Sequence, residues 1–585
     1  MTLLPILTLC LAILYPSILA VKIPQDPNPQ PLSWWKEEVI YQVYPRSHQD
    51  SDGDGIGDLE GIISRLDHFV DIGVGAVWLS PIYKSPMKDM GYDISNFTDI
   101  EPVFGTIETF KRMAAGMKER GIRLVMDFVP NHSSDQHPWF NMSAERIEPY
   151  TDYYVWKDPA GFDEEGKPLP PNNWVSLFGG PMWEYNEVRG QFYLHQFLKE
   201  QPDLNFENRQ LRNEILAVFK IWLDYGVDGF RVDAVPHLFE DQSYPDEEEN
   251  PNRPPDIPPT DYAYWLHQHT YNLPGCFEAL AEMRQLLDIY TLADGKERVM
   301  MVEATVPPPG LFEYYGTKDK PIAHFPFNFD IIGIPSAYNA ANVENVMSLW
   351  YDNLPEGEWA NMLSSNHDNK RVPSRYTEEA IDFFNMMVLL LPASAVTYYG
   401  EEIGMSNANI SWEDTTDEAA CAAGPDRYHL FSRDPSRTPM QWDDSDKAGF
   451  STANKTWLPV HPDYVELNVA AQKNSTGTTH LSIYKRLMQL RHTDVWRYGS
   501  LETKPVEDNK VFGFSRIFND KGFMVLSNTV NETVTINATQ EFEGVPETAT
   551  VYVVSVGFQP ETTVGSSVDT NSVVIGPKHS IVVEF

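Results

Sequence analysis

Three acidic residues follow short apolar runs that are typical of buried strands. Asp233 ends a run that begins at Gly229, Glu303 follows residues 299–302, and Asp368 comes shortly after a third run. If these strands belong to one barrel, the three carboxyl groups meet at the face formed by the carboxyl ends of the strands. Two carboxyl groups on either side of a sugar can break a glycosidic bond. The spacing therefore predicts a site for glycoside hydrolysis.

The first two acids suggest different roles. Arg231 lies two residues before Asp233, so both side chains share one face of a strand. A nearby cation should keep Asp233 ionised, as a nucleophile requires. Glu303 ends an apolar strand, a setting that favours the protonated form and therefore a general acid. Taken alone, a structural Arg–Asp ion pair and an exposed or helix-capping Glu would explain the same residues.

Polar residues beside the acids complete the predicted site. Asp368 and His367 can hold sugar hydroxyls through hydrogen bonds that strengthen as the ring distorts. His132 follows the predicted strand over residues 123–128 and is expected to do the same. A single buried His is more often structural, but two of them at strand ends beside acids favour a binding site.

A second acidic cluster has alternating carboxylates around a glycine turn, the pattern of a calcium loop. Asp50, Asp52, Asp54 and Asp58 would supply carboxylates, and Ile56 a backbone carbonyl. The Glu at the twelfth position of an EF-hand loop is absent, so an acidic turn without metal is the alternative. We expect a structural Ca2+ ion here.

Eight short apolar runs alternate with amphipathic stretches, of which residues 106–120 and 208–225 have clear helical patterns. Strand–helix alternation predicts a parallel sheet, and eight such units predict an α/β fold of the (β/α)8, or TIM-barrel, class. The predicted strands are residues 39–44, 76–79, 123–128, 228–232, 299–302, 323–325, 362–364 and 395–399.

The remaining segments predict further domains. Residues 133–207 are too long for one loop and are expected to form an inserted domain after the third strand. Residues 492–585 contain short alternating runs, typical of a C-terminal antiparallel β-sandwich. The barrel would comprise residues 21–132 and 208–491. Within it, residues 240–260 carry four consecutive acids and six prolines, which predicts a solvated, mobile rim loop rather than an interaction tail.

Composition restricts the partners and the compartment. The formal net charge of −40 disfavours nucleic acid, anionic membranes and acidic substrates, whereas a small neutral sugar is not repelled. Residues 1–20 are almost all apolar and end at Ala20, as in a secretory signal peptide. No later stretch is long and apolar enough for a membrane span. We therefore expect a secreted, extracellular protein, whose oligomeric state the sequence leaves open.

Two further features relate to secretion. Cys276 and Cys421 remain after signal removal, and the sequence leaves open whether they form a disulfide. N-glycosylation is expected at seven sequons, whereas Asn131 fits the pattern but is expected at the site and unglycosylated. The seven are Asn96, Asn141, Asn409, Asn454, Asn474, Asn531 and Asn537.

Taken in this order, the motifs resemble the α-amylase superfamily, glycoside hydrolase family 13, over the whole chain after residue 20. Residues 201–205 and 433–442 resemble two hallmarks of its α-glucosidase and oligo-1,6-glucosidase group, and the chain is most similar to the secreted insect maltases within that group. The superfamily motifs are residues 73–81, 127–132, 229–233, Glu303, 366–368 and 399–402.

The resemblance implies a role for each site residue. Asp233 would be the nucleophile, Glu303 the acid/base, and Asp368 the stabiliser of the transition state. Ala234, next to the nucleophile, favours α-1,4 over α-1,6 linkages. Asp89 and Tyr92 would close the pocket behind the bound glucose. The contacts to this non-reducing glucose would come from Asp89, Tyr92, His132, Arg231, His367 and Arg433, the last preferred over Arg437.

The expected activity is that of a retaining exo-α-glucosidase, or maltase. It would release terminal α-1,4-linked glucose from maltose, short oligosaccharides and sucrose by double displacement. A transglucosidase or an oligo-1,6-glucosidase would share every catalytic residue. A non-catalytic binding protein or receptor, like the transporter heavy subunits that resemble this fold, is disfavoured because all three acids survive.

Overall fold

The computed structural model describes residues 20–559 and 561–585, so residues 1–19 of the expected signal peptide lie outside the described part. A parallel sheet at the centre of the molecule has the strand order β16-β13-β12-β6-β3-β2-β18-β17. Every predicted strand is present within two residues of its expected bounds, which confirms the barrel. The strands are β2 (Val39–Val43), β3 (Ala76–Leu79), β6 (Arg123–Phe128), β12 (Gly229–Val232), β13 (Val299–Val302), β16 (Phe325–Pro326), β17 (Asn361–Leu363) and β18 (Ser394–Tyr398).

The barrel wall closes differently between β16 and β17. In the described part of the chain no strand ladder joins these two strands. The buried side chain of Asn361 bridges the gap instead. Its Oδ1 accepts from the N–H of Asn328 at 2.8 Å, and its Nδ2 donates to the carbonyl of Pro326 at 2.7 Å. One amide therefore satisfies the backbone groups that a ladder would otherwise pair.

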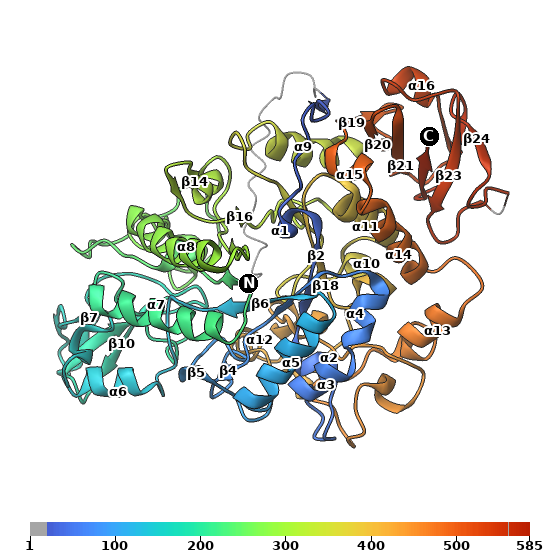
Figure 1. Ribbon diagram of the computed structural model, residues 1–585. Helices are drawn as coiled ribbons and strands as arrows, with labels where there is room; N and C mark the ends of the chain where they lie inside the picture. The colour runs from blue at the N-terminus through green and yellow to red at the C-terminus, as the bar shows by residue number, and fades with distance from the viewer. Residues whose placement is uncertain (1–19, 560) are drawn as a thin grey trace.

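Amphipathic helices surround the barrel (Figure 1). Both predicted helices are confirmed, and side chains cap their first turns. Thr106 accepts from the N–H of Thr109, and Asn208 accepts from the N–H groups of Gln210 and Leu211. The helices that follow the strands are α3 (Leu59–Ser64), α4 (Leu66–Ile72), α5 (Ile107–Glu119), α7 (Arg209–Asp224), α8 (Pro274–Asp294), α9 (Ala340–Tyr351), α11 (Ala380–Leu390) and α14 (His480–Arg491).

An antiparallel sheet lies at the C-terminal end, as expected (Figure 1). It also includes β1 (Val21–Ile23), which pairs with β19, although the sequence analysis assigned these three residues to the barrel. The other strands are β19 (Leu501–Val506), β20 (Val511–Phe518), β21 (Lys521–Asn528), β23 (Thr548–Val554), β24 (Ser567–Asp569) and β26 (Ser580–Glu584), while β22 (Val534–Ile536) pairs with β25 (Val573–Ile575).

The segment between β6 and α7 forms a small sheet of its own, from β7 (Trp156–Lys157), β10 (Trp183–Asn186) and β11 (Gln191–Leu194). The acidic rim segment packs against this inserted segment. Asn173 exchanges two hydrogen bonds with the backbone of Glu247, whose buried carboxylate accepts from the N–H groups of Gln268 and His269. Most of residues 240–260 are exposed, in keeping with the prediction of a solvated rim loop, but Glu240 and Glu247 are buried, and Glu247 is held by groups from distant parts of the chain.

The cysteines and the helices bear on the cellular compartment that the sequence predicted. Cys276 in α8 is buried, Cys421 in α12 (Glu418–Ala423) is exposed, and both are free, so the disulfide that the sequence left open does not form. None of the helices within residues 20–559 and 561–585 has the length and apolar character to cross a bilayer.

Glu240 makes the stability of the fold depend on pH. It is buried, and burial raises its pKa to about 8. A carboxyl group whose pKa is raised on folding stabilises the fold at low pH, and this contribution is lost as the pH rises through the folded value. We expect Glu240→Gln to raise the free energy of unfolding at pH 9, relative to wild type, by on the order of 3 kcal/mol. At pH 5 the gain should be at most about 1 kcal/mol, since the folded carboxyl is neutral there and only the unfolded chain ionises.

Thermal denaturation at both pH values measures this difference. Glu187→Gln is the matched control, because Glu187 is an exposed acid on the neighbouring inserted segment. The control should behave alike at pH 5 and pH 9. A gain from Glu240→Gln of the same size at both values would contradict the assignment.

Candidate active site

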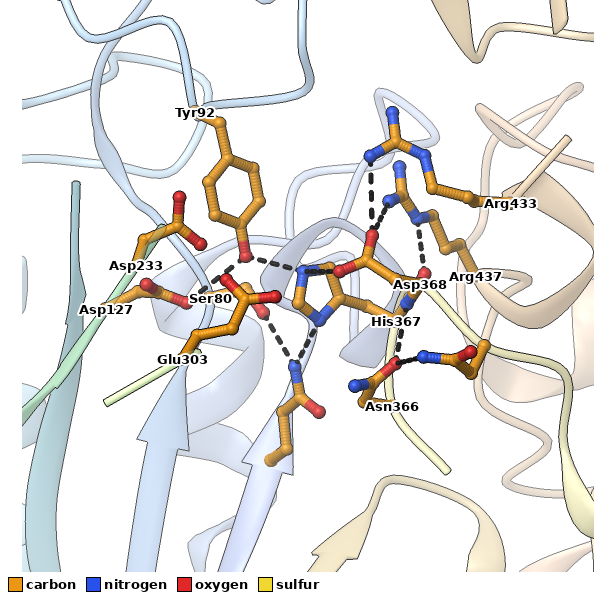
Figure 2. Close-up of polar contacts among 12 residues, drawn as sticks. Ser80, Tyr92, Asp127, Asp233, Glu303, Asn366, His367, Asp368, Arg433 and Arg437 are labelled. Carbon is orange, nitrogen blue, oxygen red and sulfur yellow. Dashed lines mark hydrogen bonds and ion pairs between the residues drawn. The ribbon is translucent and has the colours of Figure 1, made fainter. Parts of the chain in front are cut away.

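The carboxyl ends of the barrel strands bring Asp233, Glu303 and Asp368 together (Figure 2). β12 and β13 are parallel and pair Val232 with Val302, so Asp233 and Glu303 leave the sheet at the same level. Asp368 follows β17, which only β16 separates from β13 around the closed barrel. Figure 2 shows the first two acids opposite Asp368 and its arginine partners.

Arg231 holds the acidic half of the site together. It is 1% exposed. Its Nη1 forms ion pairs with Asp233 and, at 3.0 Å, with Asp127, while its Nη2 lies 2.8 Å from Glu303 Oε2. Because both nitrogens belong to one planar guanidinium group, the carboxyl groups of Asp233 and Glu303 are held close to each other.

Three carboxyl groups share this single guanidinium. Burial raises the pKa of Asp233 well above its ordinary value, and the charges of Glu303 and Asp127 add to this while Arg231 opposes it. Burial likewise raises the pKa of Asp127 to about 6. Burial and the two neighbouring carboxyl groups therefore outweigh Arg231, so the pKa of Asp233 shifts in the direction opposite to the one expected from a nearby cation.

Tyr92 connects the two halves of the site (Figure 2). Its hydroxyl lies 2.6 Å from His367 Nε2 and 3.2 Å from Asp127 Oδ2. The other ring nitrogen of His367, Nδ1, lies 2.8 Å from Nε2 of Gln42. Burial lowers the pKa of His367 to about 3, so its ring is neutral at neutral pH. The arrangement fixes both rings beside the acids.

The second half of the site centres on Asp368. Its Oδ1 lies 2.9 Å from Arg437 Nη2 and 3.3 Å from Arg433 Nη1. Burial would raise the pKa of Asp368, but the neighbouring groups outweigh it and hold the pKa well below its usual range. Because His367 is neutral near pH 7, the two guanidinium groups are the effective cause. Asp368 therefore stays ionised.

Of the two arginines, Arg433 is the more accessible. Its side chain is 17% exposed, against 1% for Arg437, and its Nη2 forms a 3.0 Å ion pair with Asp89. Arg437 instead donates to the carbonyl of His367 at 2.8 Å. Arg433 can therefore reach a ligand, while Arg437 supports the backbone beneath.

Three residues of the site, Asp127, Gln201 and Asp417, were not predicted from the sequence. Asp127 bonds Arg231, and Gln201 Nε2 lies 3.2 Å from Asp89 Oδ2 and 3.0 Å from His132 Nε2. Both belong to motifs already recognised, so their position was a usable signal. Asp417 accepts from the backbone N–H, Nε and Nη2 of Arg433. It lies in a segment without a recognisable pattern, so only the structure identifies it.

The acidic loop before α3 brings carboxylates together as a metal site would. Oxygens of Asp50, Asp52 and Asp58 lie within 4.8 Å of one another, whereas Asp54 instead accepts from the N–H of Ile56 at 2.7 Å. The turn requires glycine at residue 55. Gly55 has a φ angle of +93°, and a Cβ there would overlap the backbone carbonyl of Lys455. Such a set of oxygen ligands suits a hard cation such as Ca2+.

An eight-stranded barrel with paired carboxyl groups at the strand ends defines a glycoside hydrolase. Residues 42–499 match the family described as the catalytic domain of α-amylase. The match spans most of the chain, and the chain belongs to this family.

Individual relatives match over nearly their whole length. The chain is 45% identical to maltase 1 of Drosophila virilis, covering 95% of this chain and 87% of that protein. It is 42% identical to the salivary alpha-glucosidase of Aedes aegypti, covering 95% of each. Among solved structures, the alpha-glucosyl transfer enzyme XgtA is 32% identical, with a TM-score of 0.81, covering 95% of this chain and 100% of that chain.

Proposed function

We propose that this protein is a retaining exo-α-glucosidase that removes terminal α-1,4-linked glucose from maltose, short oligosaccharides and sucrose. The observation that carries the proposal is that one guanidinium group, that of Arg231, binds both Asp233 and Glu303. A retaining mechanism needs carboxyl groups about 5–5.5 Å apart, whereas an inverting mechanism needs roughly 6.5–9.5 Å. The names of a maltase and a salivary α-glucosidase among the relatives support an α-glucosidic substrate.

The cluster would work in two displacements. Asp233 attacks the anomeric carbon while Glu303 transfers a proton to the glycosidic oxygen, so the bond to the leaving sugar breaks. Glu303, now ionised, then takes a proton from water. The resulting hydroxide attacks the anomeric carbon and releases Asp233, which leaves glucose with its original configuration.

The opposite half of the site would bind the glucose. Asp368, held ionised by its arginines, can accept hydrogen bonds from hydroxyl groups of the ring. His132 and Tyr92 line the site beside it, and burial lowers the pKa of His132 to about 4, so it too is neutral. The ion pair between Asp89 and Arg433 links Asp89 to the arginine that also holds Asp368, and we expect this pair to close the pocket after one glucose unit. Such a pocket favours exo-action.

The acidic loop would hold a structural Ca2+ ion through Asp50, Asp52, Asp54, Asp58 and the carbonyl of Ile56. The close approach of three of these carboxylates supports the assignment. A bound divalent cation would offset their mutual repulsion and so stabilise the first turn of the barrel.

Removing the ion should lower the melting temperature more than the activity at room temperature. Scanning calorimetry with EDTA, and again after adding back Ca2+, measures the first effect, and maltose hydrolysis measures the second. Asp52→Asn should melt lower and respond little to EDTA. A melting curve of the wild type that EDTA leaves unchanged would contradict the metal site.

We further infer that the protein is secreted and N-glycosylated. The salivary relative and the apolar first twenty residues support secretion. Five of the predicted glycosylated residues are exposed: Asn141, Asn409, Asn454, Asn474 and Asn531. Asn131 is buried and bonds Asp203 and His132, in keeping with its expected lack of a glycan.

A substrate panel tests the proposed activity. The protein should release glucose from maltose and sucrose faster than from isomaltose, and leave starch largely intact. NMR spectra taken in the first minutes should show α-glucose before mutarotation. Release of β-glucose would exclude the retaining mechanism, and internal cleavage of starch would exclude exo-action.

Transfer to a sugar instead of water is a second candidate, favoured by the similarity to a glucosyl transfer enzyme. The same covalent intermediate would then react with a sugar hydroxyl group. Product analysis at high maltose concentration separates the two, because a transglucosidase accumulates trisaccharide while a hydrolase yields glucose.

A further inference from the structure

Strand β1 brings the backbone of Val21 to a buried carboxyl group. Val21 is 2% exposed, and its N–H donates to Oε1 of Glu344 at 3.2 Å. Glu344 lies on α9 and is 0% exposed. Oγ1 of Thr503 donates to the same oxygen at 2.8 Å. The pairing of β1 with β19 places Val21 opposite Thr503, so the register of the sheet fixes this meeting point.

The carboxyl group of Glu344 lacks a charge partner in the described part of the chain. Its second oxygen, Oε2, is buried there without any hydrogen-bond partner. Burial raises the pKa of Glu344 to about 7, and the groups that oppose this shift are neutral donors. A buried carboxyl group without a cation costs folding free energy whenever it ionises. Oε2 of Glu344 therefore lacks a donor in the described part of the chain, and a charged donor would offset the cost of ionising this group.

Val21 is also the first residue after the segment expected to be a signal peptide, which ends at Ala20. We propose that, after hydrolysis of the Ala20–Val21 peptide bond, the new α-ammonium group of Val21 forms a buried ion pair with Glu344 and so stabilises the folded protein. The inference is independent of the proposed activity. It assigns a processing site and gives the mature amino terminus a structural role.

The chemistry is ordinary peptide hydrolysis by a secretory endopeptidase that accepts a small residue before the cut. Water adds its hydroxyl to the carbonyl carbon of Ala20, the carbon–nitrogen bond breaks, and the nitrogen of Val21 takes the remaining hydrogen. The amine then gains a proton from solvent, since an α-amino group has a pKa of about 7.7–8.0. The ammonium group has three N–H donors, so it can serve both oxygens of Glu344, where the peptide N–H serves one.

The test compares two mature chains in two backgrounds. One chain begins at Val21, freed from a fusion partner by a site-specific protease. The other keeps Ala20, so that the nitrogen of Val21 remains an amide. Each is made with Glu344 and with Glu344→Gln. The chain that begins at Val21 should melt at least about 2 °C above the one that keeps Ala20, and Glu344→Gln should remove this difference.

Glu502→Gln is the matched control. Glu502 also lies beside β1, but its carboxylate pairs with the side chain of Lys22 at 3.2 Å and not with the backbone of Val21. It should lower both melting temperatures by the same amount. The intact mass of the protein secreted from the full-length gene should correspond to a chain that begins at Val21.

Three results would overturn the inference. They are a secreted chain that begins at another residue, equal melting of the two chains, or a difference between them that survives Glu344→Gln. If Glu344→Gln does not fold, chemical labelling of the wild-type amino terminus provides the test instead. An amine-reactive ester should modify the α-amine of the folded wild type at least about tenfold more slowly than that of the unfolded chain, because local opening must come first. Equal labelling rates would then refute the ion pair.

Discussion

Replacing Asp233 with Asn should abolish maltose hydrolysis while the protein stays folded. An amide cannot form the covalent ester with the anomeric carbon, so kcat should fall by about 10^4-fold or more. The fold should tolerate the change, because burial already raises the pKa of Asp233 and an amide resembles the neutral acid. Initial rates with maltose and a thermal melt of the same preparation measure both effects.

Asp228→Asn is the matched control for this substitution. Asp228 directly precedes β12, at the opposite end of the strand from Asp233, and its carboxylate bonds Arg123 and the N–H of Leu124. Residues at that face of a barrel contribute to stability and not to chemistry. The control should therefore melt lower and keep its activity. Retention of more than about 1% of wild-type turnover by Asp233→Asn would refute the nucleophile assignment.

Glu303→Ala should slow hydrolysis in a way that depends on the leaving group. Without a general acid, kcat/KM for maltose should fall by about 10^3–10^4-fold. A 4-nitrophenyl glucoside should lose far less in this first step, because its leaving group needs no proton. Added azide should then restore turnover by attacking the glucosyl enzyme, and it should yield the α-glucosyl azide.

The pH profile provides a further check on Glu303. In the wild type the alkaline limb should reflect loss of the proton that the general acid donates, and this limb should vanish in Glu303→Ala. Glu297→Gln is the control, since Glu297 lies before β13 and accepts from Ser33 and Trp35 far from the site. Equal losses for maltose and the nitrophenyl glucoside would show that Glu303 is not the acid.

The barrel and the main site residues follow from local sequence patterns. Short apolar runs ended by acids predict strands and place Asp233, Glu303 and Asp368 at one face, because parallel strands all point the same way. Helix caps such as Thr106 are equally local. For such features the neighbouring residues supply nearly all the information, so the structure differs from the predictions by only one or two residues at the ends.

Features that depend on distant partners could not be predicted. From the sequence Arg231 was expected to pair with Asp233, whereas in the fold it also pairs with Asp127 and Glu303. The acids of the rim segment looked solvated, yet Glu247 finds buried N–H partners. Asp417 meets Arg433 across a segment without periodicity. A sequence shows which side chains are charged, but it does not show how many of them form ion pairs with the same group in the fold.

The barrel is joined by the fewest hydrogen bonds between β16 and β17, where the side-chain amide of Asn361 supplies them. Where the other neighbouring strands are joined by ladders, β16 and β17 depend on the two hydrogen bonds of one side chain. Transient separation of the wall should cost least at this seam, because few bonds must break together. The backbone amide hydrogen of Asn328 should therefore exchange with deuterium faster than the amide hydrogens within β12 and β13. Slow local opening of the barrel should begin between β16 and β17.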